Sequence, residues 1–258
     1  MPLSDEHLAQ LSEAKRLLEN PGLAVKISNL VGKPIEKGFE LLPNNWSQRI
    51  GMATKEALMF AMKGALLTMD SHSEEAYPRW HKVAAALSGA AGGAFGLPAL
   101  IAELLVSTTI MCRSIADIAR ANGESLDSVS TRLACIEVFA LGGTTRLDDA
   151  AEIGYFAVRS SLARAVSEAA EYLASQAFAE ESAPALVRLI ALVATRFQIQ
   201  VSEKAAAQMV PIIGAAGGAV INLLFIDHFQ DMSRGHFTVR RLERQYGSEA
   251  VRRAYEKI

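Results

Sequence analysis

One stretch of this sequence says most about the fold. Residues 210–247 read VPIIGAAGGAVINLLFIDHFQDMSRGHFTVRRLERQYG, and the hexapeptide GAAGGA at residues 214–219 also occurs at residues 89–94. An apolar segment follows each copy, with an acid at nearly the same place, Glu103 in one and Asp227 in the other. We interpret the two segments as a degenerate internal repeat of about 35 residues. The alternative is chance recurrence of Gly/Ala words in an alanine-rich chain.

The glycines of both copies have the spacing of helix-packing residues. On a helix, a GxxxG pair removes Cβ atoms from one face and lets another backbone approach closely. We therefore predict that the two copies cross each other at their glycines. These are Gly89, Gly92, Gly93, Gly96, Gly214, Gly217 and Gly218.

The pattern of apolar residues is helical almost throughout the chain. Residues 4–22 begin with a capping serine and early acids and end at Pro-Gly, as is typical of an amphipathic helix. Because no segment alternates apolar and polar positions with β-branched residues, we predict no strands. The sequence therefore predicts an all-α fold, a single multi-helix bundle with two Gly/Ala-rich apolar hairpins. Further helices are expected at 23–41 (disturbed at Pro34), 47–69, 125–143 and 147–178, with a loop at 70–80.

Length and charge indicate one globular unit without a nucleic-acid partner. A chain of 258 residues is long enough for one large domain or two small ones, and no segment has the composition of a linker. We expect amphipathic helices in residues 1–78 to pack on a helical core in residues 79–258, as one continuous unit. The formal net charge of −2 provides no general field that would hold DNA or RNA.

The cysteines and the N-terminus indicate where the protein resides. Cys112 and Cys135 lie among apolar neighbours without a CxxC motif or the spacing of a zinc site, so we expect buried, reduced thiols. Residues 1–20 carry early acids and lack the apolar core of a secretory signal. We therefore expect a cytoplasmic protein, either free or peripheral on the inner face of the cell membrane.

Three segments, residues 96–126, 132–143 and 201–247, resemble the bacterial EcsC family. The shared features are a glycine-rich helix leading to an acid, a later Val-Pro-x-x-Gly, a Gly-Gly pair and an Asn, and a final arginine-rich helix. The similarity runs from about residue 80 to residue 255. It implies a helical protein of unsettled biochemical role, whose name-giving relative is encoded beside ABC-transporter subunits. Glu103 stands where the family pattern has aspartate, which lengthens the side chain by one methylene.

Two uncharged stretches, residues 83–102 and 209–226, have enough length to span a membrane. Leu97 precedes a proline, which disfavours helical geometry there and divides the first stretch. The second stretch is rich in glycine, alanine and valine and gains less from lipid than leucine or phenylalanine would. We expect these stretches to be the buried centre of the bundle. A shallow or conditional membrane contact and true membrane spans remain as alternatives.

The helix after the second GAAGGA carries polar residues on a largely apolar background. His228 and Asp231 share a helix face and, with Glu103 or Glu203 from elsewhere, have the side-chain types that bind transition metals. A lone histidine on an apolar helix is more often a hydrogen-bonded core residue, so we expect a buried polar network and no cofactor. The metal site at His228 and Asp231 remains the alternative. The candidate polar cluster is Glu103, Asn222, Asp227, His228, Asp231 and His236.

The motif search favours a non-catalytic protein. The sequence has no HExxH, GxSxG, GxxxxGK[ST] or GxGxxG, and no catalytic residue is identified. Our first hypothesis is an accessory protein linked to transport or secretion, held peripherally by a membrane surface or a membrane-protein partner. The alternative is a soluble helical enzyme or ligand-binding protein with a polar or metal site between the repeats. Neither the reaction, the partner nor the oligomeric state follows from the sequence.

The C-terminal arginines have two interpretations. They form either a solvated face offset by nearby acids or a contact for anionic lipid headgroups or an acidic partner. They are Arg234, Arg240, Arg241, Arg244, Arg252 and Arg253.

Overall fold

The structure, a computed structural model, is helical in the parts of the chain that it describes. The described residues are 3–19, 23–31, 36–42, 44–68, 97–142, 154–175, 184–209 and 214–258. Within these ranges no strand occurs, so the predicted all-α fold is confirmed. The elements are α1 (Asp5–Leu18), α2 (Leu23–Val31), α3 (Glu36–Glu40), α4 (Trp46–Thr68), α6 (Leu97–Ala121), α7 (Val129–Glu137), the 3-10 helix η1 (Val138–Ala140), α8 (Tyr155–Ser175), α9 (Pro184–Gln208), α10 (Gly214–Tyr246) and α11 (Ser248–Lys257).

Local signals in the sequence account for some of the helix ends. Ser4 caps α1 by accepting a hydrogen bond from the His7 backbone N–H at 3.3 Å. The helix predicted at 23–41 is divided into α2 and α3. Pro34, between them, lies outside the described residues, as does the predicted loop at 70–80. Gly142, where the helix predicted at 125–143 was expected to end, has a φ of +72° and follows η1.

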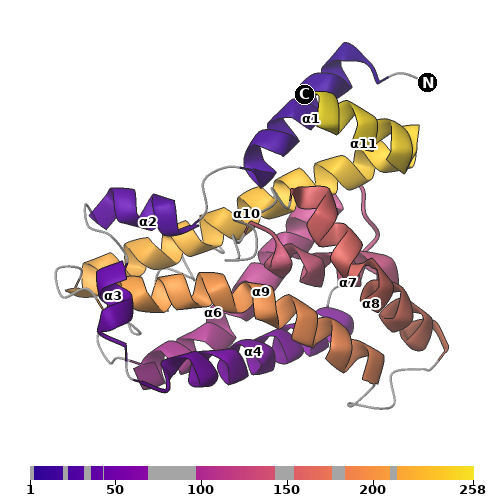
Figure 1. Ribbon diagram of the computed structural model, residues 1–258. Helices are drawn as coiled ribbons and strands as arrows, with labels where there is room; N and C mark the ends of the chain where they lie inside the picture. The colour runs from indigo at the N-terminus through magenta and orange to yellow at the C-terminus, as the bar shows by residue number, and fades with distance from the viewer. Residues whose placement is uncertain are drawn as a thin grey trace.

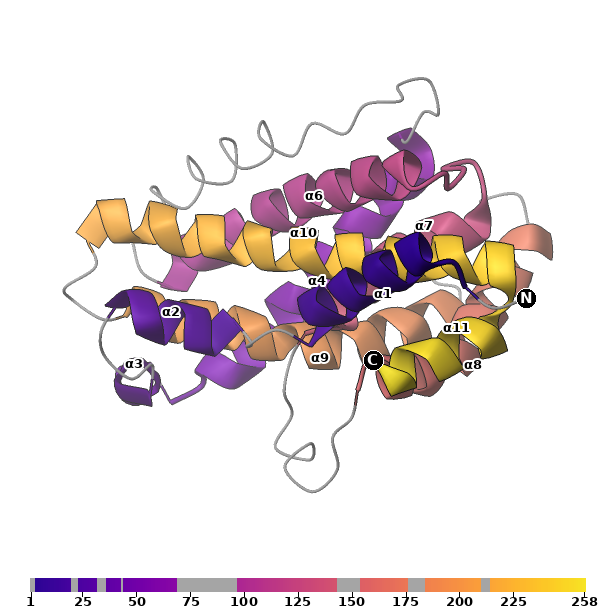
Figure 2. The ribbon, with the colours of Figure 1, turned by 90° about the horizontal axis from the view of Figure 1, so that it is seen from above.

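Four long helices, α4, α6, α9 and α10, make the body of the bundle (Figure 1). The longest, α10, runs the length of the molecule, with α2 beside its first half and α1 and α11 against its last half (Figure 2). On the other side of the bundle α4 packs against α6 and α9. The core therefore lies between these four helices, and α1 and α11 form a separate layer far from α4.

Phenylalanine side chains from three elements form the centre of the core. Phe139 of η1, Phe197 of α9 and Phe229 of α10 are fully buried, with ring centroids 5.0 to 5.4 Å apart. Burial of each such ring contributes on the order of 1.5–3 kcal/mol to folding. The two cysteines are buried free thiols, as predicted, and burial raises the pKa of Cys112 to about 12.

The two segments that contain the GAAGGA words meet as packed helices. α6 and α10 contact each other, and Gln230 donates a hydrogen bond to Ser114 Oγ at 2.8 Å across their interface. Gly218, in the first turns of α10, is buried. The first GAAGGA copy lies outside the described residues, as does the boundary expected at 78–79. The internal repeat and the crossing at its glycines therefore remain predictions.

The structure describes much of the second apolar stretch and only a small part of the first. From residue 214 onward the second stretch is part of α10, where Ile221, Phe225 and Ile226 are buried in the core. The first stretch lies mostly outside the described residues. In the described part of the chain one helix, α9, is long and apolar enough to cross a membrane by length and composition. Half of its apolar window is buried, and a core helix of a bundle has the same composition.

A glycine sets the distance between α1 and α10. A Cβ atom on Gly235 would lie 2.6 Å from Leu18 Cγ and 3.0 Å from the Ala14 carbonyl oxygen. Both distances are shorter than the van der Waals contact of a methyl group, so only glycine fits without displacing α1. The close helix contact that the sequence analysis placed at the GAAGGA words is thus present at a glycine further along α10.

Replacing Gly235 should separate α1 from α10. We expect Gly235→Ala to lower the free energy of unfolding by about 1–2 kcal/mol, because overpacking exceeds the gain in helix propensity. Gly64→Ala in α4 is the matched control, since no atom of the described residues would lie within 4 Å of its Cβ. It should be neutral or stabilise by up to about 1 kcal/mol. Urea unfolding of both variants is the measurement, and equal effects would contradict the packing argument.

Candidate functional site

A buried lysine connects three of the four long helices. Lys204, on α9, has a fully buried side chain, and its Nζ lies 2.8 Å from both carboxylate oxygens of Glu103 on α6. The same ammonium donates to Asn222 Oδ1 on α10 at 2.7 Å and lies 4.7 Å from the ring centre of Phe225. Its three N–H donors thus have acceptors, which is the condition for a charge to remain stable inside a protein.

The surroundings of Lys204 favour a structural role. Burial lowers the pKa of this lysine, while the Glu103 carboxylate opposes the fall. Lysines with lowered pKa values serve as nucleophiles when a substrate can reach them. Lys204 has no exposed surface, and its donors are already occupied. The ion pair therefore fixes how α6, α9 and α10 pack together.

Two of the predicted site residues, Glu103 and Asn222, come together in this network, whereas Lys204 was missed. A lysine in a helix usually points to solvent, so the sequence VSEKAAAQ was not interpreted as a core segment. A signal was present, because Lys204 follows Phe197 by seven positions and Val201 by three. That spacing places all three on one helix face, and all three are buried.

His228 lies in a second, separate environment. Its ring is buried and close to Gly142, where a Cβ atom would lie 2.6 Å from His228 Cε1 and 2.6 Å from Met232 Sδ. In the described part of the chain neither ring nitrogen has a well-formed hydrogen bond. Burial lowers the pKa of His228 to about 3, with a smaller effect of the same sign from Lys26, while the nearby Leu141 carbonyl opposes it.

The two aspartates of the predicted cluster are only partly buried. Asp231 accepts hydrogen bonds from Lys26 at 3.4 Å and Arg234 at 3.1 Å, near the surface between α2 and α10. Asp227 is half-buried on the same helix. Among the described residues, no three His, Cys, Asp or Glu side chains lie close enough together to hold a metal ion. The residues of the predicted polar cluster therefore lie in several separate environments, five of them on α10 and Glu103 on α6.

His236 belongs to a third environment, near the C-terminal end of the bundle. Its Nδ1 lies 2.9 Å from the hydroxyl of Tyr155, and both side chains are buried. Burial lowers the pKa of His236 and raises that of Tyr155. Beside them Arg159 donates to both carboxylate oxygens of Glu243 at 2.9 and 3.1 Å. Tyr155 and Arg159 were not among the predicted residues.

A groove opens next to this pair, and we call it the α8 groove. It is bounded by α7, α8, α10 and α11, and its lining includes Glu137, Phe156, Arg159, Val166, Ala170, Arg240, Glu243, Glu249 and Arg252. Glu137 is only 7% exposed, yet no hydrogen bond or ion pair reaches its carboxyl group from the described residues. Burial raises the pKa of Glu137, and Arg159 and Arg240 oppose that rise.

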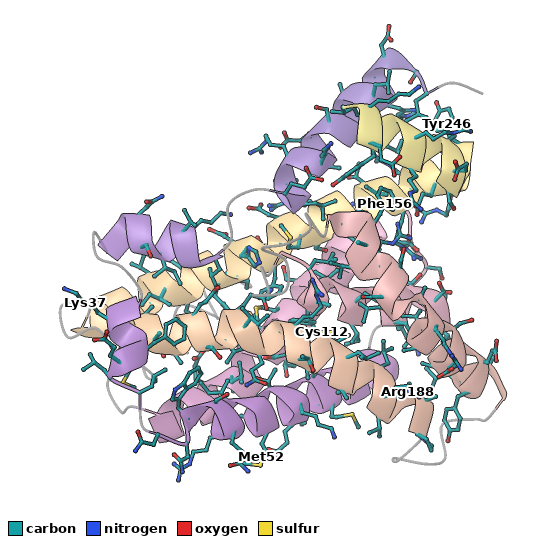
Figure 3. All side chains as sticks on the ribbon, in the orientation of Figure 1. Lys37, Met52, Cys112, Phe156, Arg188 and Tyr246 are labelled. Atoms are coloured by element: carbon teal, nitrogen blue, oxygen red, sulfur yellow. The ribbon has the colours of Figure 1, made fainter. Side chains whose placement is uncertain are left out.

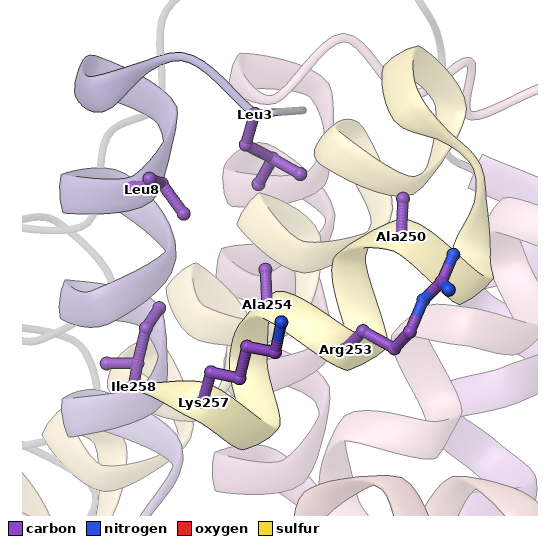
Figure 4. Close-up of a pocket in the computed structure, with 7 residues that line it drawn as sticks. All are labelled: Leu3, Leu8, Ala250, Arg253, Ala254, Lys257 and Ile258. Atoms are coloured by element: carbon purple, nitrogen blue, oxygen red, sulfur yellow. The ribbon is translucent and has the colours of Figure 1, made fainter. Parts of the chain in front are cut away.

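A second hollow lies between the start of α1 and α11 (Figure 4). Its wall is mainly aliphatic, formed by Leu3, Leu8 and Ile258 with two alanines, and Arg253 and Lys257 stand at its edge. These two charged residues are exposed. The hollow offers an apolar surface without a buried polar group to direct a reaction.

The C-terminal arginines have acceptors within the chain. Arg240 and Arg244 both pair with Glu124, which follows α6, and Arg241 donates to Gln10 of α1 at 2.8 Å. Their positive charges therefore connect α10 to neighbouring elements. The other pairs are Arg234–Asp231, Arg252–Glu256 and Arg253–Glu249.

Comparison with known proteins identifies the family. The model of the EcsC protein family matches residues 5–242, nearly the whole chain, and the chain belongs to this family. The matched range begins at residue 5, whereas the sequence resemblance was noted from about residue 80 onward. No curated protein matches the chain. No solved structure matches it either.

The buried His228 should make stability depend on pH. Its pKa is lower in the folded than in the unfolded chain, so below pH 6.5 the unfolded chain takes up a proton that the folded chain excludes. Stability should therefore fall between pH 6.5 and about 3, with a contribution from His228 that approaches about 1.4 kcal/mol per pH unit.

His228→Leu should remove the pH dependence of stability that comes from His228. The pH dependence that comes from the buried His236 should remain. The measurement is the free energy of unfolding in urea at pH 7 and pH 4.5 for both proteins. The variant should lose less stability than the wild type between these pH values. Parallel losses would show that His228 is protonated in the folded chain.

Proposed function

We propose that this member of the EcsC family is a non-catalytic accessory protein that binds an anionic membrane surface through one face of α4 and α6. We call this the α4–α6 face and define it by Arg49, Met52, Lys55, Phe60, Val106 and Arg113. The link to transport or secretion that the family resemblance implies is part of the proposal.

Exposed apolar side chains carry the proposal. Met52 and Phe60 on α4 are 55% and 58% exposed, and Val106 on α6 is 52% exposed. Met59 and Leu105 line a shallow groove between α4 and α6. Met52 lies on the outer side of α4, away from the core (Figure 3). Contiguous apolar surface of this kind is typical of protein or membrane contact sites.

Unpaired basic side chains favour lipid as the occupant of this face. Arg49, Lys55 and Arg113 are exposed, and in the described part of the chain none of them forms an ion pair. Glu56 is the acid that lines the groove between α4 and α6. Basic residues around exposed apolar side chains suit a bilayer with anionic headgroups, to which each basic residue contributes roughly 1 kcal/mol.

The α4–α6 face lies on a different side of the molecule from the C-terminal arginines, which were the earlier candidates for lipid contact. From the sequence, contact with lipid headgroups was one of two interpretations of the C-terminal arginines, which lie on α10 and α11. α11 lies at the opposite side of the bundle from α4, so one flat membrane cannot contact both (Figure 1). Since the C-terminal arginines also have acceptors within the chain, we propose the α4–α6 face as the contact.

Vesicle flotation tests the proposal. Wild-type protein should float with vesicles of phosphatidylglycerol and phosphatidylcholine at low salt, and high salt should reduce binding because the Debye length shortens. A Met52→Ser and Phe60→Ser double variant should bind at least tenfold more weakly, since each side chain would lose on the order of 1.5–3 kcal/mol of burial. Lys55→Glu should bind about tenfold more weakly and lose part of the salt dependence.

Val25→Ser on α2 is the matched control. Val25 is 48% exposed, and α2 lies against α10 on the other side of the bundle from α4 (Figure 1). This variant should float as the wild type does. Wild-type protein that remains unbound at both low and high salt, or a double variant that binds as well as the wild type, would contradict the proposal.

A further inference from the structure

The α8 groove contains an acidic group whose partner is missing from the described chain. Glu137 ends α7, is 7% exposed and lines the groove. Every other acid that lines it has a basic partner, since Glu243 pairs with Arg159 and Glu249 with Arg253. The Glu137 oxygens are not among the fully enclosed polar atoms that lack a partner, so the carboxyl group reaches the groove. A ligand in the groove that donates hydrogen bonds to Glu137 would replace water there.

The basic residues nearest to Glu137 are already engaged. Arg159 uses two nitrogens on Glu243, and Arg240 uses two on Glu124. Both guanidinium groups are held by these pairs and keep their positions in the groove wall. No described residue donates a hydrogen bond to Glu137, and the ligand group that best matches a carboxylate is an ammonium.

A second, opposite charge is available at the rim of the same groove. Arg252 of α11 lines the groove and donates its Nε to Glu256, an exposed pair that contributes little stability. Among the described residues its two terminal nitrogens have no acceptor, so they can bind an anionic group. Phe156, which lies where α8 meets α11, has the Arg252 guanidinium 5.9 Å from its ring centre (Figure 3). The ring supports Arg252 on the groove side.

We propose that the α8 groove binds a small zwitterion, with an ammonium group on Glu137 and a phosphate or carboxylate on Arg252. The wall beyond these charges follows α8 and combines Val166 and Ala170 with Ser160 and Ser167. Two kinds of ligand carry such a zwitterion: a small molecule in solution, or the ethanolamine headgroup of a phospholipid. The site is independent of the α4–α6 face.

Calorimetric titration with O-phosphoethanolamine tests the small molecule in solution. Wild-type protein should bind it, and phosphocholine should bind at least about tenfold more weakly because its quaternary nitrogen has no N–H to donate to Glu137. Glu137→Gln should lose at least about tenfold in affinity. Glu249→Gln is the matched control on the same groove and should change the affinity less than about twofold.

The melting temperature separates lost binding from lost folding. Because Glu137 has no partner within the described chain, Glu137→Gln should melt at the wild-type temperature or higher. Arg252→Gln should also fold normally and should weaken O-phosphoethanolamine without weakening ethanolamine. Equal binding of O-phosphoethanolamine by Glu137→Gln and wild type, or equal binding of phosphocholine and O-phosphoethanolamine, would overturn the proposal.

Flotation with neutral vesicles tests the phospholipid headgroup. Vesicles of phosphatidylethanolamine and phosphatidylcholine lack the anionic charge that the α4–α6 face would bind, so a lipid ligand should give flotation that rises with phosphatidylethanolamine and requires Glu137. If the protein binds O-phosphoethanolamine but does not float with these vesicles, the ligand is a small molecule in solution. Absence of both overturns the proposal.

Discussion

The arrangement of this bundle depends on one buried ion pair. Lys204 carries a positive charge into the interior, where an unpartnered charge would cost several kcal/mol. Its acceptors, Glu103 and Asn222, come from two other helices, so the pair forms only when α6, α9 and α10 have the right register. The ion pair thus selects one packing among the many that helices rich in alanine allow, and the phenylalanine core stabilises that packing.

The distribution of the remaining charges explains why the two proposals concern different surfaces. α10 and α11 carry many basic residues, but Glu124, Glu243 and neighbouring acids pair with them. On α4 and α6, basic residues without an ion pair in the described chain surround exposed apolar side chains. The α8 groove, by contrast, leaves a buried carboxyl group, Glu137, without a partner from the described chain. A membrane contact and a ligand site therefore follow from separate observations.

The sequence predicted the fold better than the site, for physical reasons. Apolar spacing, the Ser4 cap and proline positions are local, and they predicted the all-α fold and most helices. The polar cluster was expected on α10, but neighbouring positions on a helix face different surroundings: His228 points to Gly142, and Asp231 lies near Lys26. Lys204 was missed because its partner Glu103 is distant in sequence, which no local pattern reports. Glu137 was also missed, because the groove that it lines is formed by helices distant in sequence.

The most direct test of this account is a double-mutant cycle on the central ion pair. Urea unfolding at pH 7 would give the free energies of unfolding of the wild type, Lys204→Met, Glu103→Leu and the double variant. If the pair fixes the register, each single variant should lose about 3–5 kcal/mol, because it leaves one buried charge without its partner. The double variant should then be more stable than either single variant. Losses that simply add would contradict a paired, buried charge at the centre of the bundle.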